Sequence, residues 1–175
     1  KKNVLFDFDG VLVDSFEISY QAALGAGSPL TREQQKKLFE GNLFESLKKI
    51  KVSKDHEQRY YEQYVPRLFE TPPMKGIHEA IESLSQTYQL IVVSSTVSSP
   101  IQGYLTMHKL DRHFDWIMGG DIHKNRTVKI NMVMQEYKVS PKNCIFVTDT
   151  LGDIKEAAKC NVESIGVSWG FHETE

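Results

Sequence analysis

Near its start the chain reads Val4-Leu5-Phe6-Asp7-Phe8-Asp9-Gly10, a short apolar run that ends in two carboxylates and a glycine. An apolar run of this length is typical of a strand covered on both faces of a sheet. Gly10 allows the chain to turn sharply after the two acids. Four more apolar runs follow along the chain, at 90–93, 116–118, 144–147 and 164–167.

Helical patterns separate these apolar runs. They cover about 76–87, 98–109, 127–138 and 152–160. Strands that alternate with helices of this length are typical of βαβ units with parallel strands. We therefore predict an α/β fold, a three-layer Rossmann-like core in which a parallel sheet lies between two layers of helices.

The interval 15–73 interrupts this alternation, because it contains no strand pattern. Thr31 and Gln34 form a capping-box signal, and helical patterns follow through 38–47 and 55–70. A long helical crossover is one explanation, but roughly 58 residues exceed what a crossover needs. We therefore predict a small helical cap inserted after the first strand. The expected units are a discontinuous core, 1–14 and 74–175, and a cap, 15–73.

Composition excludes several classes of protein. The chain has 175 residues, with 21 basic and 23 acidic side chains and a net charge of −2, which argues against a nucleic-acid binder. No apolar run approaches the roughly 18 residues of a membrane span, and the start lacks a signal-peptide pattern. Cys144 and Cys160 are expected to be reduced thiols of a cytoplasmic protein. The expected state is a monomer or homodimer that binds neither nucleic acid nor membrane.

Oxygen-bearing side chains follow three of the apolar runs, at 7–10, 94–96 and 148–153. In an open parallel sheet, ligands bind outside the carboxyl ends of the strands, so these segments are expected to meet in one crevice.

Four carboxylates lie in these segments: Asp7, Asp9, Asp149 and Asp153. Carboxylates gathered in one crevice repel one another, and we expect a cation to compensate them. A set of oxygen ligands without His or Cys suits Mg²⁺, which also keeps water and substrate phosphate as ligands.

The same segments resemble the motifs of the haloacid dehalogenase superfamily. Residues 7–15 resemble its first motif, Ser94 after an apolar strand its second, and 148–154 its fourth. Residues 168–172 are similar to a segment of phosphoglycolate-phosphatase-like members. A helical insertion directly after the first motif is similar to the C1-capped subgroup.

The resemblance implies catalytic roles for individual residues. Asp7 would be the nucleophile that forms an aspartyl-phosphate, and Asp9 would protonate the leaving alcohol and then activate water. Ser94 would donate a hydrogen bond to a phosphoryl oxygen. Main-chain amides near Ser95 and Gly10 would assist it in binding the substrate.

The resemblance also implies a set of Mg²⁺ ligands. Asp7, the main-chain carbonyl of Asp9, and Asp149 would bind the ion directly. Asp153 would bind it or hold its water ligands.

The third motif of the family, a Lys or less often an Arg near the start of a helix, has three candidates here. Arg126 and Lys124 both stand at suitable spacings before Asp149. Lys129 ranks below them, because it is expected to lie within the helix. Each of the three could also be a solvated surface charge, so the assignment stays open.

The function favoured by this reasoning is an Mg²⁺-dependent phosphatase that hydrolyses a small phosphorylated metabolite. A phosphomutase of the same superfamily would use Asp7 and Asp9 in the same way, and a binding module of this fold with little activity is a further alternative. A dehalogenase has no need of the acid–base group that Asp9 offers. A receiver-like signalling domain would lack the helical insertion.

Overall fold

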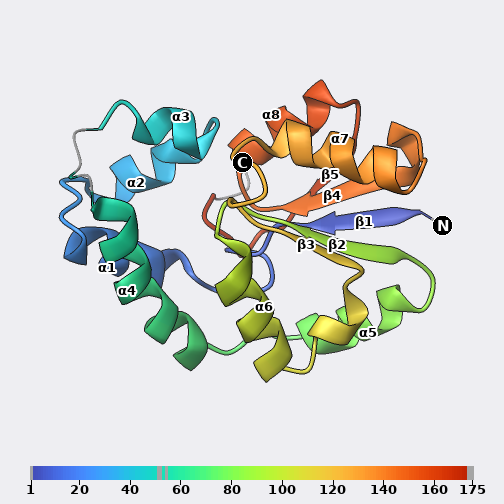
Figure 1. The fold of residues 1–175 in the computed structure, drawn as a ribbon, viewed down its shortest axis with the longest axis horizontal. Coiled ribbons are helices and arrows are strands. Elements are labelled where there is room, and N and C mark those ends of the chain that lie inside the picture. The colour runs from blue at the N-terminus through green and yellow to red at the C-terminus, as the bar shows by residue number, and fades with distance from the viewer. Residues whose placement is uncertain (1, 51–52, 54, 173–175) are drawn as a thin grey trace.

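A computed structural model describes residues 2–50, 53 and 55–172 of the chain. Its centre is a parallel five-stranded sheet with the strand order β3-β2-β1-β4-β5 (Figure 1). The strands are β1 (Asn3–Phe6), β2 (Gln89–Val93), β3 (Trp116–Met118), β4 (Cys144–Thr148) and β5 (Glu163–Gly166). Leu5 of the central strand pairs with Ile91 on one side and with Phe146 on the other.

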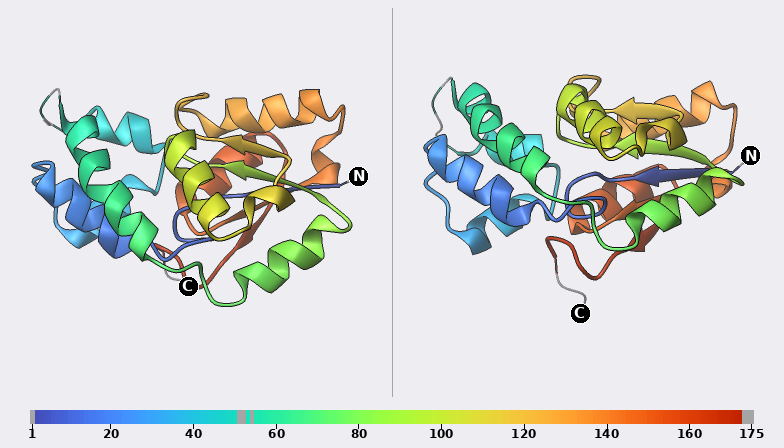
Figure 2. Two further views of the ribbon diagram at one scale, coloured as in Figure 1. Left: turned by 60° about the horizontal axis from the view of Figure 1, so that its bottom comes forward. Right: turned by 90° about the horizontal axis from the view of Figure 1, so that it is seen from below.

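Helices cover both faces of the sheet (Figures 1 and 2). They are α5 (Ile77–Ser85), α6 (Ser98–Met107), α7 (Arg126–Glu136) and α8 (Leu151–Lys159), with short 3-10 helices at Asp111–His113 and Pro141–Asn143. Successive residues of β1 point to opposite faces. Phe6 packs in the core under α5 and α6, and Leu5 packs in the core under α7 and α8. The predicted α/β fold with three layers is confirmed.

Within the residues that the structure describes, four further helices lie between β1 and α5, and we call them the helical insert. They are α1 (Phe16–Gly25), α2 (Arg32–Leu38), α3 (Leu43–Leu47) and α4 (His56–Glu70). The insert stands beyond the carboxyl ends of the strands (Figure 1). No helix among the described residues is long and apolar enough to cross a membrane.

The structure confirms some of the local features predicted for the insert and differs in others. Thr31 and Gln34 form the predicted capping box of α2. The helical pattern through 38–47 is interrupted, however, because the chain leaves the helix after Leu38 and starts α3 anew. The side chain of Asn42 caps α3 by accepting a hydrogen bond from the amide of Glu45 at 3.2 Å.

Candidate active site

The strand order reverses beside β1, which places a crevice at the carboxyl ends of β1 and β4. Asp7 directly follows β1, and its amide donates to the carbonyl of Val147 at 2.9 Å, which continues the ladder between the two strands. Its carboxylate oxygen Oδ1 accepts from the amide of Phe8 at 2.8 Å. The backbone therefore fixes this acid at the mouth of the sheet.

Arg126, the first residue of α7, bridges two buried acids. Its Nη2 lies 2.8 Å from Oδ2 of Asp7, and its Nε lies 2.9 Å from Oδ1 of Asp153, although that N–H is not aligned for a hydrogen bond. Nη1 donates to the hydroxyl of Ser95. Burial raises the pKa of Asp7 well above its ordinary value, and the guanidinium opposes this shift. Arg126 thus compensates much of the negative charge at this end of the sheet.

Asp153 has both oxygens engaged. Oδ2 accepts from the hydroxyl of Thr148 at 2.9 Å, while Oδ1 faces Arg126. Its position in the first turn of α8 is favourable for a negative charge, because the positive end of the helix dipole lies there. In this arrangement the carboxylate holds the guanidinium in place.

Asp149, at the end of β4, is held differently. Its Oδ2 accepts from the amide of Phe171 at 2.6 Å, but its Oδ1 is buried without a hydrogen-bond partner. A Cβ at Gly10 or Gly170 would come within 2.1 Å of this side chain, so both glycines make room for it. Burial, and next the charge of Asp7, raises the pKa of Asp149 to about 7. The unpartnered oxygen is suited to a cation.

A magnesium ion fits part of the predicted ligand set. No group of three or more His, Cys, Asp or Glu side chains within the described residues is arranged to hold a metal by itself. Mg²⁺ commonly takes only one or two carboxylates and completes its shell with water and phosphate. Asp149, with its free oxygen, and Asp7 meet that requirement. Part of the compensating positive charge comes from the protein itself, because Arg126 pairs with Asp7 and Asp153.

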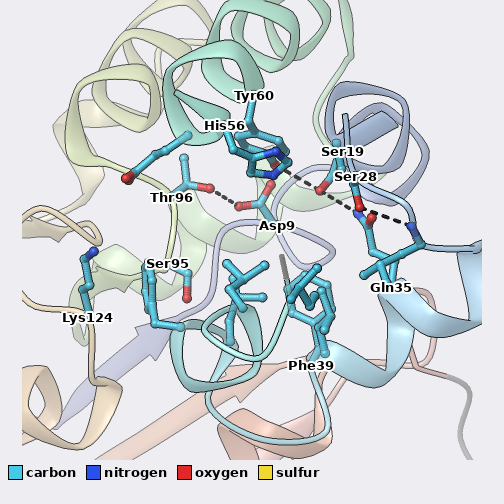
Figure 3. A pocket seen from close by; sticks show the side chains of 18 of the residues that line it. Asp9, Ser19, Ser28, Gln35, Phe39, His56, Tyr60, Ser95, Thr96 and Lys124 are labelled. Atoms are coloured by element: carbon cyan, nitrogen blue, oxygen red, sulfur yellow. Dashed lines mark hydrogen bonds between the residues drawn. The ribbon is translucent and has the colours of Figure 1, made fainter. Parts of the chain in front are cut away.

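Asp9 points into the crevice and accepts hydrogen bonds from three hydroxyl groups. Oδ1 accepts from Ser15 at 2.7 Å and from Tyr64, and Oδ2 accepts from Thr96 at 2.7 Å (Figure 3). Tyr64 belongs to α4 and is fully buried, and burial raises the pKa of its hydroxyl well above the ordinary value. The second acid of the first motif is therefore held jointly by the sheet and by the insert.

A second cation of α7 lies behind the crevice. Lys129 is fully buried, and its Nζ donates to the carbonyl oxygens of Ser94 and, at 3.2 Å, Gly119. Burial, and next the nearby charge of Arg126, lowers the pKa of Lys129 to about 7. Lys124, in contrast, is exposed, and its Nζ lies 5.1 Å from the ring centre of Phe44.

A cavity of about 380 Å³ lies between the strand ends and the insert. Core residues line one end of it, and they are Asp7, Asp9, Ser95, Thr96, Lys124, Arg126, Thr150 and Phe171; side chains of the insert form the rest. Figure 3 shows Asp9, Ser95, Thr96 and Lys124 in this position. A negatively charged phosphoryl group would find a buried guanidinium there, next to a carboxylate that can act as a nucleophile.

The sequence matches the family of haloacid dehalogenase-like hydrolases over residues 4–167. The chain belongs to this family. The predicted membership, and with it the prediction of a hydrolase, is confirmed, whereas the C1-capped subgroup stays a prediction.

Similar proteins include named phosphatases. A phosphoglycolate phosphatase of Vibrio vulnificus is 26% identical over 99% of this chain and 86% of its own length. A 5'-nucleotidase of Pseudomonas aeruginosa is 25% identical over 97% of this chain and 83% of its own. A haloacid dehalogenase-like hydrolase from Streptococcus pneumoniae has the same fold, with a TM-score of 0.81 at 24% identity over 99% and 87% of the two chains.

The structure of this hydrolase brings most of the predicted site residues together at one end of the sheet. Two of them are placed otherwise than expected. The hydroxyl of Ser94 accepts from the amide of Thr96 at 3.1 Å and does not line the cavity. The amide of Gly10 donates to the carbonyl of Val13 at 2.9 Å, so it is engaged within its own turn. Ser95 and Thr96 line the cavity instead.

Sequence reasoning gave no role to the three residues whose hydroxyl groups hold Asp9. Ser15 is the last residue of the segment 7–15 that resembles the first motif, but it was not singled out. Thr96 belongs to the segment 94–96 that follows a predicted strand, so its position at the crevice could have been predicted from the sequence. Tyr64 belonged to a pattern of tyrosines that is equally typical of ordinary helix packing. Nothing in the sequence indicated that its hydroxyl contacts an acid 55 positions earlier in the chain.

Proposed function

We propose that this hydrolase is a phosphatase that cleaves phosphate monoesters with Asp7 as the nucleophile. The observation that supports this most is the contact between Asp7 and the buried guanidinium of Arg126, which begins α7 at the floor of the cavity. A phosphoryl group that binds beside Asp7 would share this cation, and Ser95 would offer a hydroxyl to its oxygens.

In the first step, an oxygen of Asp7 bonds to phosphorus while the ester oxygen leaves. Asp9 donates a proton to that oxygen, so the alcohol departs neutral. In the second step, Asp9 takes a proton from water, the water oxygen attacks phosphorus, and Asp7 is released as a carboxylate with inorganic phosphate. The three hydroxyl donors to Asp9 would keep its carboxylate aimed at the cavity.

We propose further that Mg²⁺ is the cofactor, held by Asp7, by Asp149 through its unpartnered oxygen, and by the main-chain carbonyl of Asp9. When bound, the ion would neutralise negative charge on the phosphoryl group. Asp153 would act chiefly by holding Arg126, since its two oxygens already have partners.

We propose that residues 15–73 act as a cap that closes over the cavity of a cytoplasmic enzyme. Contacts between the insert and α8 support this. The amide of Gly152 donates to the carbonyl of Phe39 at 2.8 Å, and the side chain of Asn42 donates to Glu156 at 3.0 Å. A cap seated in this way would exclude water from the reacting groups.

Turnover of p-nitrophenyl phosphate tests the proposed activity. We expect phosphate release in Mg²⁺, loss of release in EDTA, and loss of release in the variant Asp7→Asn. The matched control is Asp14→Asn, which changes an exposed acid outside the cavity and should retain activity. No release at any Mg²⁺ concentration would contradict the proposal.

A further inference from the structure

One wall of the cavity, which we call the insert wall, is apolar. It is formed by half-buried side chains of the insert, which are Leu30, Leu38, Phe39, Leu43, Phe44 and Leu47. Polar side chains of the insert, among them Ser28, Gln35 and His56, also line the cavity. Figure 3 shows Phe39 on this wall, across from Asp9. Two more rings, those of Tyr60 and Tyr61, line the same cavity.

Helix α3 has no fully buried residue. Leu43 and Leu47 stand one helical turn apart and line the cavity, so the apolar face of this helix covers the cavity and not an internal core. Apolar surface that borders a water-filled cavity is unfavourable until another apolar group covers it. A ligand with a matching group would supply that cover.

The charges around this wall do not suit a small acid. Among the described lining residues, the insert contributes two charged side chains, Lys48 and Glu57. Lys48 already pairs with Glu45 at 2.6 Å and is 70% exposed. Lys124 of the core is exposed beside Phe44. A carboxylate placed against the leucines would lose its water without gaining a buried cation.

We propose that the preferred substrates are phosphate monoesters whose alcohol carries a bulky aromatic group, which the insert wall contacts. This inference rests on the proposed phosphatase function and names its substrate class. A cavity of about 380 Å³ falls in the range of sites that take a ring system, and Asp7, Ser95 and Arg126 lie at the end where the phosphate would bind. A two-carbon acid phosphate would leave most of the wall uncovered.

A matched substrate series tests the proposal. Ethyl, benzyl and 2-naphthylmethyl phosphate all release primary alcohols, so their leaving groups differ little while the apolar group grows. We expect kcat/KM to rise along the series, with naphthylmethyl phosphate at least about tenfold above both ethyl phosphate and phosphoglycolate. A flat series, or a preference for phosphoglycolate, would overturn the inference and leave the phosphatase proposal intact. Failure to hydrolyse any monoester would overturn both.

Variants of the insert wall test whether its leucines cause the preference for aromatic substrates. Leu43→Gln and Leu47→Gln should each lower kcat/KM for naphthylmethyl phosphate about tenfold and leave ethyl phosphate unchanged. The matched control Leu24→Gln changes a leucine of α1 that is 40% exposed and lies outside the cavity, so both substrates should be unaffected. Calorimetric titration gives a readout without turnover, because naphthylmethylphosphonate should bind at least about tenfold more tightly than methylphosphonate. Equal affinities would contradict the proposal.

Discussion

Arg126 is the residue on which the charge balance of the site depends, because it contacts Asp7 and Asp153 at once. Arg126→Ala would leave two buried carboxylates without their partner. We expect a loss of about 3–5 kcal/mol in the free energy of unfolding, measured by urea denaturation, together with loss of turnover. Arg126→Lys should recover part of the stability, since an ammonium can reach only some of these contacts.

Lys124→Ala is the matched control for that prediction. Lys124 is exposed and pairs with no carboxylate among the described residues, so stability should change by less than about 0.5 kcal/mol. Equal small losses in the two alanine variants would contradict the role of Arg126 as the partner of both buried carboxylates.

The buried amine of Lys129 should make the free energy of unfolding depend on pH. Its pKa is lowered to about 7 in the folded protein, whereas an unfolded lysine titrates near 10.4. Between these values the unfolded chain binds more protons, so the free energy of unfolding should rise with pH, by up to about 1.4 kcal/mol per unit. Urea denaturation at pH 7.0 and 8.5 measures the rise. Lys129→Met should remove this increment, and an unchanged slope in the variant would refute the explanation.

Among the helices, α4 connects the insert to Asp9, the proposed general acid, through Tyr64. Tyr64→Phe removes one of three donors to Asp9. The remaining donors, Ser15 and Thr96, would hold the Asp9 carboxylate less firmly toward the cavity, so kcat for phosphate release should fall about tenfold. Tyr104→Phe is the matched control, because that buried hydroxyl donates to the carbonyl of Thr71, away from the cavity. An equally small change of kcat in both variants would disprove this role of α4.

The elements were largely predictable, because their signals are local. The apolar runs, the helices between them and the capping box at Thr31 all follow from residues within one or two turns. The break between α2 and α3 was not predictable, since the intervening segment contacts α8, where Gly152 donates to Phe39. The contact of Tyr64 with Asp9 was not predictable for the same reason, because the two residues are distant in the chain.

The parallel topology of the sheet explains why the position of the site could be predicted from the sequence. Carboxyl ends of parallel strands meet at one edge, so Asp7 and Asp149 had to lie near each other. Topology alone could not show which of Lys124, Arg126 and Lys129 contacts the acids. The contact depends on which face of α7 turns toward the sheet, and that face carries Arg126 and Lys129.

Binding of Mg²⁺ should stabilise the whole molecule. An ion that binds only the folded protein raises the melting temperature by mass action, and at 100 times the dissociation constant it adds about 2.7 kcal/mol. Differential scanning fluorimetry in millimolar MgCl₂ and in EDTA measures this shift. Asp149→Asn should abolish the shift, while Asp14→Asn should retain it. A melting temperature that is the same in MgCl₂ and in EDTA would contradict the proposed metal site.

In the proposed reaction, Asp7 carries the phosphoryl group between the two steps. In Asp9→Asn, p-nitrophenyl phosphate should still react once, because p-nitrophenolate leaves without an acid, but the second step would lack its base. We predict a burst of about one p-nitrophenolate per chain and, after acid quenching, a phosphoryl group on the peptide that contains Asp7, detected by mass spectrometry. Turnover by the wild-type protein with no such adduct in either protein would contradict the account.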